Sequence, residues 1–232
     1  PLNFTLKRDT IKLQAVKSKM LSPGYGYVRL ALFQGNVNSQ MQRALKTLKK
    51  QAKGRLAGLV LDLRNNPGGL LDSGTAVANT FLTSSELNPK CKDLIVYTKG
   101  RAQDSKLQVR ASGTDMIEGV PMVVLINNGS ASASEIVAGA LQDYNRAIIM
   151  GTRSFGKGSV QTILPIGDDE AIKLTTALYF TPAGREIQAQ GIEPDVVVKQ
   201  LDIKKAKPSG MQISEADLQD HIVNGNGKKS AD

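Results

Sequence analysis

Two short segments carry side chains that could form a catalytic pair. The first, Gly129–Glu135, places three alternating serines where an apolar strand gives way to a helix. The second, Ser154–Gln161, holds Lys157 between two glycines. A neutral lysine amine can act as the general base for a serine hydroxyl, a recognised variant of Ser-His-Asp chemistry. The sole histidine, His221, lies in a polar C-terminal stretch, which argues against a Ser-His-Asp triad.

Each segment also has an ordinary structural interpretation. Serine is a favoured helix N-cap, so Ser130, Ser132 or Ser134 could simply cap the helix that follows. A serine at that position also lies near backbone N–H groups that could hold an oxyanion. A lysine on a loop is usually a solvated charge, and Lys157 must be buried to be a neutral base. A phosphate-binding loop is disfavoured because the Gly-Lys-Gly-Ser string lacks the required spacing.

The composition is that of a globular α/β protein. The chain has 232 residues, of which 41% are hydrophobic and 22% charged, enough for one large domain or two small ones. No apolar run approaches the roughly 20 residues that span a bilayer, and no signal peptide is visible. Because the chain opens at Pro1 without an initiator methionine, we expect a processed or trimmed fragment.

The single cysteine, Cys91, excludes an internal disulfide. Its neighbours Lys90 and Lys92 could make the thiol reactive, and the alternative is a surface cysteine without a role. With one cysteine and one histidine the chain cannot build an ordinary zinc site, and we expect no metal or cofactor.

The net charge of +9 raises the question of an anionic partner. Aromatic residues make up only 4% of the chain and no nucleic-acid-binding motif is present, so we expect no nucleic acid. A solvated basic face is expected, with weak attraction to anionic membrane or polymer surfaces as the alternative. The basic residues crowd into one segment, namely Arg43, Lys46, Lys49, Lys50, Lys53 and Arg55.

The hydrophobic pattern alternates between strands and helices. Strands are expected at residues 3–13, 25–33, 59–63, 94–97, 120–126, 147–150, 159–165 and 171–180, and helices at 36–52, 70–82 and 133–144. The alternation from 25 to 150 predicts a mainly parallel α/β core, and the last two strands predict a hairpin. The chain turns polar and basic after about Gln200, and we expect disorder from Gly225 onward.

The two chemically interesting loops share a predicted location. Arg64–Gly69 follows one buried strand, and Gly129–Ser134 follows another. Active sites of parallel sheets gather beyond the carboxyl ends of the strands. Both loops are therefore expected at one site.

Four segments in this order resemble the carboxyl-terminal processing proteases, also called tail-specific proteases, of Ser/Lys peptidase family S41. The resemblance runs from about residue 25 to 200 and implies a ClpP/crotonase-like core: a mainly parallel sheet with flanking helices and an accessory hairpin. The four segments are Asp62–Gly69, Gly129–Asp143, Gly151–Gln161 and Gly191–Asp195.

The resemblance implies a role for each matching residue. The nucleophile falls on Ser132 and the general base on Lys157. Gln161 matches the glutamine that supports the lysine. The two oxyanion donors, both backbone amides, fall on Ala133 and Gly69.

The resemblance also implies the organisation of the chain. Residues 1–18 would be the last strand and exit linker of a PDZ domain that is otherwise missing. Residues 19–200 would form the protease core, and residues 201–232 a polar basic tail. Asp143 matches a recurrent aspartate of the family, for which we expect a structural role.

The expected activity is a serine endopeptidase acting through an acyl-enzyme. By the resemblance, its partners are polypeptides with apolar, unstructured C-termini, together with an adaptor protein, and its location is the bacterial periplasm or another exported compartment. No stable membrane insertion is expected. Two rivals remain: an acyl-transfer or isomerase enzyme on a crotonase-like core, and a non-catalytic peptide-binding scaffold.

Overall fold

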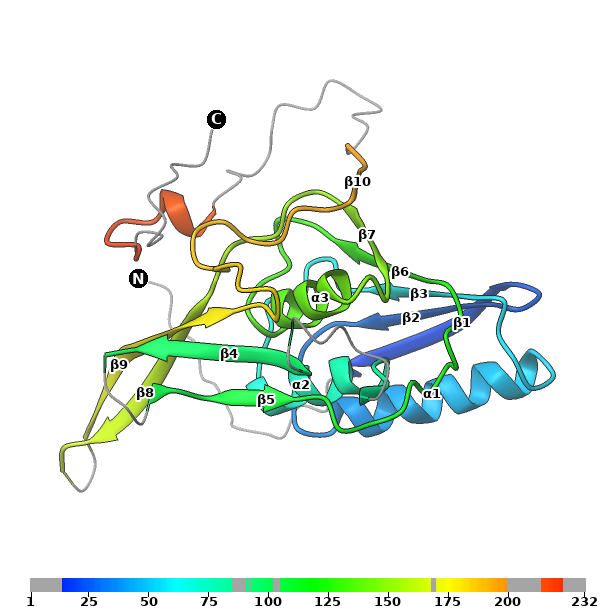
Figure 1. Cartoon of the computed structure of the whole chain (residues 1–232), viewed down its shortest axis with the longest axis horizontal. Helices are drawn as coiled ribbons and strands as arrows, with labels where there is room; N and C mark the ends of the chain where they lie inside the picture. Colours follow the sequence, from blue (N-terminus) through cyan, green and yellow to red (C-terminus); the bar gives the residue numbers. More distant parts are fainter. Residues whose placement is uncertain are drawn as a thin grey trace, which may run out of the picture.

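The computed structural model describes residues 14–84, 91, 93–101, 105–167, 170–199 and 214–222. Its central element is a six-stranded sheet (Figure 1). The strands are β1 (Val16–Ser22), β2 (Tyr25–Leu30), β3 (Gly58–Asp62), β6 (Met122–Ile126), β7 (Ile148–Gly151) and β10 (Val196–Val197). They lie in the order β1-β2-β3-β6-β7-β10, and only the β1–β2 pair is antiparallel.

A second, antiparallel sheet has the order β5-β4-β9-β8. Its strands are β4 (Leu94–Gly100), β5 (Gln108–Arg110), β8 (Ser159–Pro165) and β9 (Ala171–Phe180). The β8–β9 hairpin projects beyond the rest of the molecule (Figure 1). β8 is an edge strand, so its outer backbone groups face no neighbouring strand of this sheet.

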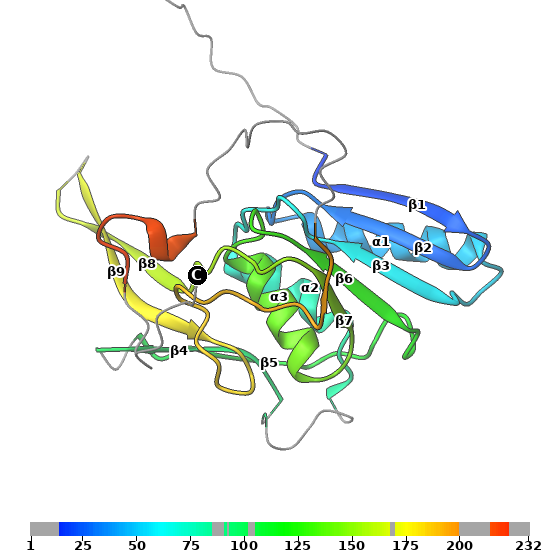
Figure 2. The same cartoon turned by 90° about the horizontal axis from the view of Figure 1, so that it is seen from above.

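The helices connect and separate the two sheets. They are α1 (Val37–Gln51), α2 (Leu71–Asn79) and α3 (Ala133–Asp143), and a single 3₁₀ turn, Glu215–Asp217, follows near the C-terminus. α1 packs along β1 and β2, whereas α2 and α3 lie between the two sheets (Figures 1 and 2). α3 is therefore covered on both sides, and all its residues from Ala133 to Leu141 are buried.

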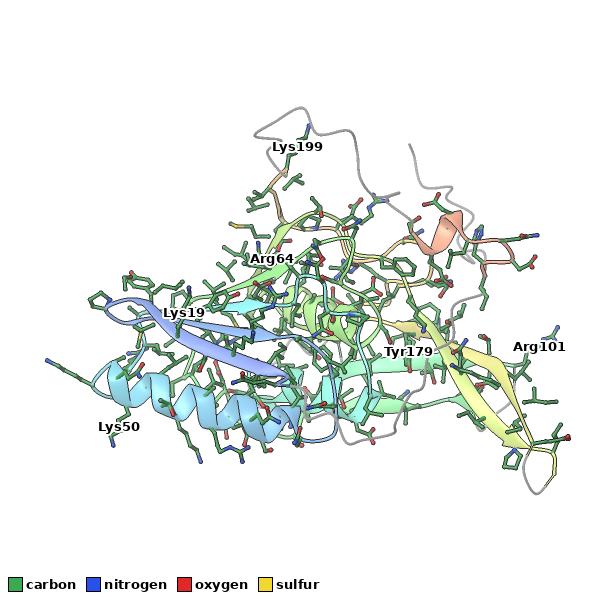
Figure 3. All side chains as sticks on the ribbon, turned by 180° about the vertical axis from the view of Figure 1, so that it is seen from behind. Lys19, Lys50, Arg64, Arg101, Tyr179 and Lys199 are labelled. Atoms are coloured by element: carbon green, nitrogen blue, oxygen red, sulfur yellow. The ribbon has the colours of Figure 1, made fainter. Side chains whose placement is uncertain are left out.

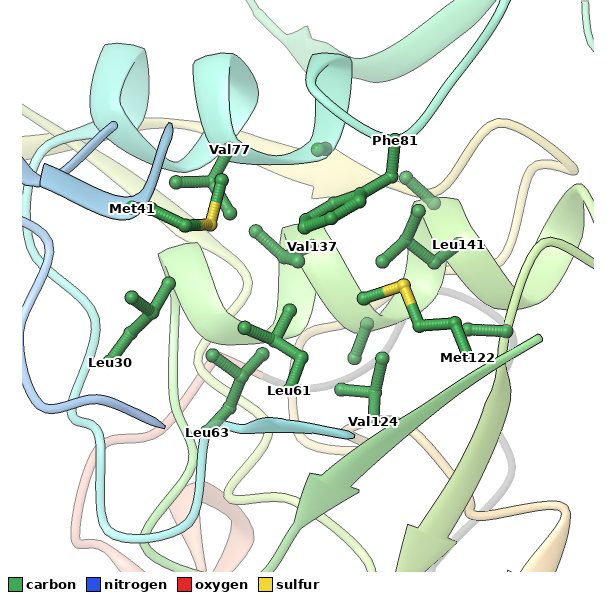
Figure 4. Close-up of a cluster of buried hydrophobic side chains, with 14 of the residues drawn as sticks. Leu30, Met41, Leu61, Leu63, Val77, Phe81, Met122, Val124, Val137 and Leu141 are labelled. Atoms are coloured by element: carbon green, nitrogen blue, oxygen red, sulfur yellow. The ribbon is translucent and has the colours of Figure 1, made fainter. Parts of the chain in front are cut away.

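The core fills the space between the parallel strands and the two inner helices (Figure 4). Apolar side chains on alternate positions of β3 and β6 point at α2 and α3, as the two-residue period of a strand requires. The residues at this contact are Leu61, Val124, Val77, Phe81, Val137 and Leu141, all fully buried. This packing fixes where the carboxyl ends of β3 and β6 meet the start of α3.

Every strand and helix expected between residues 25 and 180 is present, with ends displaced by a few residues, and the 159–165 and 171–180 hairpin is confirmed. The mainly parallel core is also confirmed. Three strands were not expected: β1, β5 and β10. β1 begins inside the segment 1–18 and pairs with β2. The strand expected at 3–13 and the disorder expected from Gly225 lie outside the described residues.

The basic segment forms the exposed side of α1 and the turn after it. Figure 3 shows Lys50 pointing away from the sheet. Lys49 is bound to Glu118 at 2.6 Å, while Arg43, Lys46 and Lys50 are exposed. None of the helices in the described part of the chain is long and apolar enough to cross a membrane.

Cys91 is not the surface cysteine considered above: it is buried, with 4% of its surface exposed. Burial raises the pKa of its thiol, and the nearby Asp143 carboxylate acts in the same direction. A raised pKa makes the thiolate scarce, so the structure gives no support to a reactive cysteine.

The close contact of α2 with α3 yields a stability prediction. A Cβ added at Gly74 would lie 2.9 Å from the Cβ of Ala133, whereas one added at Gly35 would meet nothing within 4 Å. We expect Gly74→Ala to lower the free energy of unfolding by about 1–3 kcal/mol through overpacking, despite the better helix propensity of alanine. Gly35→Ala should change it by less than about 1 kcal/mol. Urea unfolding of both variants checks this, and equal stabilities would contradict it.

Candidate active site

Ser132 lies at a strained turn between β6 and α3. Its backbone has φ 55° and ψ −114°, a conformation that is costly for a residue with a side chain. The turn is held at both sides: the Ser132 carbonyl accepts the N–H groups of Glu135 and Ile136, and the Ser132 N–H binds the Glu135 side chain. Such a strand–turn–helix arrangement presents a side chain at the mouth of the helix, as nucleophile elbows do.

The structure distinguishes the three serines of the run. Ser130 and Ser134 are fully buried, and each hydroxyl donates to a carbonyl: Ser130 to Leu63 at 2.8 Å and Ser134 to Asn66 at 2.9 Å. Ser132 is the half-buried member of the three. Ser130 and Ser134 therefore serve to hold the turn in place. Ser132 is the serine of the three whose surface is open to a substrate.

The Asn65–Gly69 loop packs directly against Ser132. The Asn66 carbonyl accepts the Ala131 N–H, and its side chain binds the Gly68 N–H and the Leu30 carbonyl. A Cβ added at Gly68 would lie 2.8 Å from the Cβ of Ser132 and 3.0 Å from the amide nitrogen of Ala133. Only a glycine allows this approach, and the two loops expected to share one site do so.

Two amides at this junction have no hydrogen-bond acceptor among the described residues: those of Gly69 and Ala133. Ala133 is the first residue of α3, where an N–H has no partner within the helix. Gly69 has φ 142°, and a Cβ there would lie 2.1 Å from the Phe33 carbonyl oxygen. Unpaired N–H groups at a helix start suit a developing negative charge.

The buried carboxylate of Asp62 holds the start of the loop Arg64–Gly69. Asp62, at the end of β3, accepts hydrogen bonds from Tyr27 at 2.6 Å and from Arg64 at 2.7 and 2.9 Å. Burial alone would raise the pKa of Asp62, but the hydrogen bonds from Arg64 and Tyr27 outweigh it and leave that pKa below its usual value. Asp62 also accepts the backbone N–H of Arg64 at 2.9 Å, so it holds both the main chain and the side chain of Arg64, which is labelled in Figure 3.

Lys157 lies on a loop whose backbone is bonded on both sides. On one side, Ser154 N–H donates to Ile192 and Ala189 N–H donates to the Gly156 carbonyl. A Cβ at Gly156 would lie 3.1 Å from the Gly191 nitrogen, so the loop and the 187–192 segment are in close backbone contact. The Lys157 side chain itself is half-buried.

On the other side of this loop lies Glu135, whose carboxylate is fully buried and shared by the two candidate catalytic segments. One oxygen, Oε2, accepts the N–H groups of Ser132 at 2.7 Å and Lys157 at 2.9 Å. The other, Oε1, accepts Ser154 Oγ at 2.6 Å and the Gly156 N–H at 2.7 Å. The backbones of Ser132 and Lys157 are thus within one hydrogen bond of the same atom.

No salt bridge to Glu135 is present among the described residues. Burial raises its pKa from 4.5 to about 7, although the hydrogen bonds from Ser154, Gly156, Ser132 and Lys157 act in the opposite direction. An ionised carboxylate offers about four acceptor sites, and four donors face it here. The arrangement is therefore complete only with the ionised form.

The remaining two predicted residues make no hydrogen bond or ion pair with Ser132 or Lys157 in the described part of the chain. Gln161 is exposed on the edge strand β8, opposite Thr175 of β9. Asp143, for which a structural role was expected, binds the Ala183 N–H at 2.7 Å and pairs with Arg185. It thus holds the turn after β9.

Sequence reasoning missed Glu135 as a site residue. It occupies the third position after Ser132, the acidic position of a Ser-x-x-Glu capping box. That pattern predicts a carboxylate folded back onto the Ser132 amide. Its second role, the contacts with Ser154–Lys157, depends on tertiary packing and leaves no local signal.

The raised pKa of Glu135 predicts a pH-dependent stability. Between pH 4.5 and about 7 the folded protein binds more protons than the unfolded chain, so this group's contribution is full below 4.5 and is lost as pH rises toward 7. The stability of wild type relative to Glu135→Gln should therefore fall by on the order of 3 kcal/mol over that interval. Denaturant unfolding at several pH values checks this, with the exposed Glu170→Gln as control; a pH-independent difference would refute it.

The sequence of this chain is similar to those of known proteins. The model of peptidase family S41 matches residues 24–198. A carboxy-terminal-processing protease of Bartonella bacilliformis is 47% identical over 100% of this chain and 51% of its own length, and one of Synechocystis sp. is 41% identical over 93% and 49%. The chain therefore spans about half the length of the curated relatives it matches.

Solved structures agree. A photosystem II D1 C-terminal processing protease aligns with a TM-score of 0.69 and 36% identity, over 82% of this chain and 50% of that one. Mature CPAF, at 16% identity and a TM-score of 0.55, shares the fold. By the family match and these relatives, the chain belongs to peptidase family S41, among the carboxyl-terminal-processing proteases.

Proposed function

We propose that this chain is the core of a serine endopeptidase in which Ser132 is the nucleophile and Lys157 the general base. The observation that carries the proposal is the shared Glu135 oxygen, which holds the backbones of both residues together at the mouth of α3. A nucleophile and base from distant loops, fixed by one buried group, match the organisation of a Ser-Lys site.

The reaction follows from the surroundings of Ser132. Neutral Lys157 takes the hydroxyl proton as the Ser132 oxygen attacks the scissile carbonyl. The amides of Gly69 and Ala133 hold the resulting oxyanion, since neither has another acceptor among the described residues. The lysine then protonates the leaving amine, and water hydrolyses the acyl-enzyme. Gln161, two strand positions beyond Ser159, would orient the lysine amine.

The substrate proposed for the whole protein is a polypeptide with an apolar, unstructured C-terminus, bound as an added strand. β8 suits this role because it is an edge strand that begins shortly after Lys157. Its side chains Ile163 and Leu164 are 65% and 43% exposed. A PDZ domain and an adaptor would recruit the substrate, and the setting would be the periplasm or another exported compartment.

Mutagenesis tests the dyad. Ser132→Ala and Lys157→Ala should each lower kcat/KM for an unfolded protein with an apolar tail by at least about a thousandfold, because each removes a group that acts in the transition state. Lys173→Ala, an exposed lysine of β9, is the matched control and should cleave normally. Equal cleavage by all variants would show that the dyad is wrong.

The same variants distinguish the proposed peptidase from the two alternative functions. An isomerase or acyl-transfer enzyme would retain its activity in Ser132→Ala, and a peptide-binding scaffold would form no acyl adduct on Ser132. Mass spectrometry of the protein trapped with a slow acylating substrate detects that adduct. A covalent acyl group on Ser132, absent from the Ser132→Ala variant, excludes both rivals.

The pH profile offers a further test. Peptidase activity should fall as pH drops through about 7, because protonation of Glu135 breaks its set of four accepted hydrogen bonds. Initial rates from pH 5 to 9 measure the profile. Activity that declines from pH 6 to 8 would contradict this role of Glu135.

A further inference from the structure

A short C-terminal segment returns to the loop that carries Lys157. The segment contains the 3₁₀ turn Glu215–Asp217, red in Figures 1 and 2. Its first amide, that of Glu215, donates to the Phe155 carbonyl at 3.3 Å. The contact lies beyond residue 198, where the family match ends.

The side chain of Glu215 makes a second contact, with Gln188. Gln188 is fully buried, and its Nε2 donates to Glu215 Oε1 at 3.1 Å. Its Oε1 accepts the Gly158 N–H at 3.0 Å. A chain of hydrogen bonds therefore runs from Glu215 through Gln188 to the residue that follows Lys157.

The Gly158 backbone has little room to adjust. A Cβ there would lie 2.4 Å from the Gln188 nitrogen, and its carbonyl accepts the Tyr179 N–H at 2.6 Å. Glu135 holds the other side of Lys157 through the Gly156 and Lys157 amides. The loop is thus fixed before Lys157 by Glu135 and after it by Gln188.

We propose that Glu215 is a positioning residue for the general base: by holding Gln188 against Gly158 it sets the approach of Lys157 to Ser132. This inference rests on the proposed Ser-Lys function. A group that acts through another residue changes the turnover of bound substrate more than its binding. Misplacement of a reacting group by about 1 Å can cost a hundredfold in rate.

The side chain of Glu215 can be tested without removing the segment. Glu215→Ala removes the carboxylate oxygen that accepts the hydrogen bond from Gln188 Nε2, whereas Glu215→Gln keeps an oxygen that can accept the same hydrogen bond. Asp220→Ala, an exposed acid in the same segment, is the matched control. In the 232-residue chain, Glu215→Ala should lower kcat about tenfold, with KM within about twofold. Glu215→Gln and Asp220→Ala should remain within about twofold of wild type.

A reversed pair provides a rescue. In Gln188→Glu the new carboxylate faces Glu215, so repulsion should displace the segment and lower kcat. Adding Glu215→Gln to this variant restores the hydrogen bond in the opposite direction: the side-chain amide at position 215 donates, and the carboxylate at position 188 accepts. The double variant should regain part of the lost kcat; a double variant no better than Gln188→Glu alone would count against the pairing.

A readout independent of turnover separates the two proposals. In a Ser132→Ala background, amide hydrogen exchange at Gly158 should be about tenfold faster in Glu215→Ala and unchanged in Asp220→Ala. Unchanged exchange, wild-type kcat or increased kcat in Glu215→Ala would each overturn the role of Glu215. If Ser132→Ala retained peptidase activity, the dyad would fail while the exchange measurement still tested the contact.

Discussion

The structure depends on one buried carboxylate. Glu135 is fully buried and has no salt-bridge partner in the described part of the chain, so hydrogen bonds offset the cost of burying its charge. Those bonds come from the Ser132 turn and from the Ser154–Lys157 loop, which follow the carboxyl ends of the neighbouring parallel strands β6 and β7. A single side chain thereby holds the two loops together at one edge of the sheet. The proposed Ser-Lys site rests on this connection.

The elements around this carboxylate are closely packed against one another. Gly68, Gly69 and Gly74 stand where a Cβ would collide with backbone or core atoms of a neighbouring element. Asp62 fixes the end of β3 with two strong partners, and Asn66 joins the loop to Ser134 and Ala131. Oxyanion donors gain their effect from such preorganisation, since amides that are already aimed need no rearrangement during the reaction.

Much of this could be predicted from the sequence. The alternation of apolar strands and amphipathic helices predicted the parallel core and the β8–β9 hairpin, because those signals are local. The burial of Ser130 and Ser134 was not predictable, since the carbonyl that each hydroxyl binds belongs to the segment after β3, more than sixty residues away in the sequence. β1 was missed because most of its seven residues are exposed and show no alternation of apolar and polar side chains, and β10 was missed because it has only two residues. The Glu215–Gln188 contact joins residues 27 positions apart, so the sequence around neither residue indicates it.

The β8–β9 hairpin has a consequence for the behaviour of the protein in solution. Ile163 and Leu164 of the edge strand β8 and Ile172 and Leu174 of its partner β9 are each more than 40% exposed. Such an edge does not discriminate between a substrate and any other extended chain, including one from a neighbouring molecule. The exposed edge proposed for substrate binding is thus also a place where two copies of this chain can pair strand to strand, which makes the hairpin an aggregation hazard at high protein concentration.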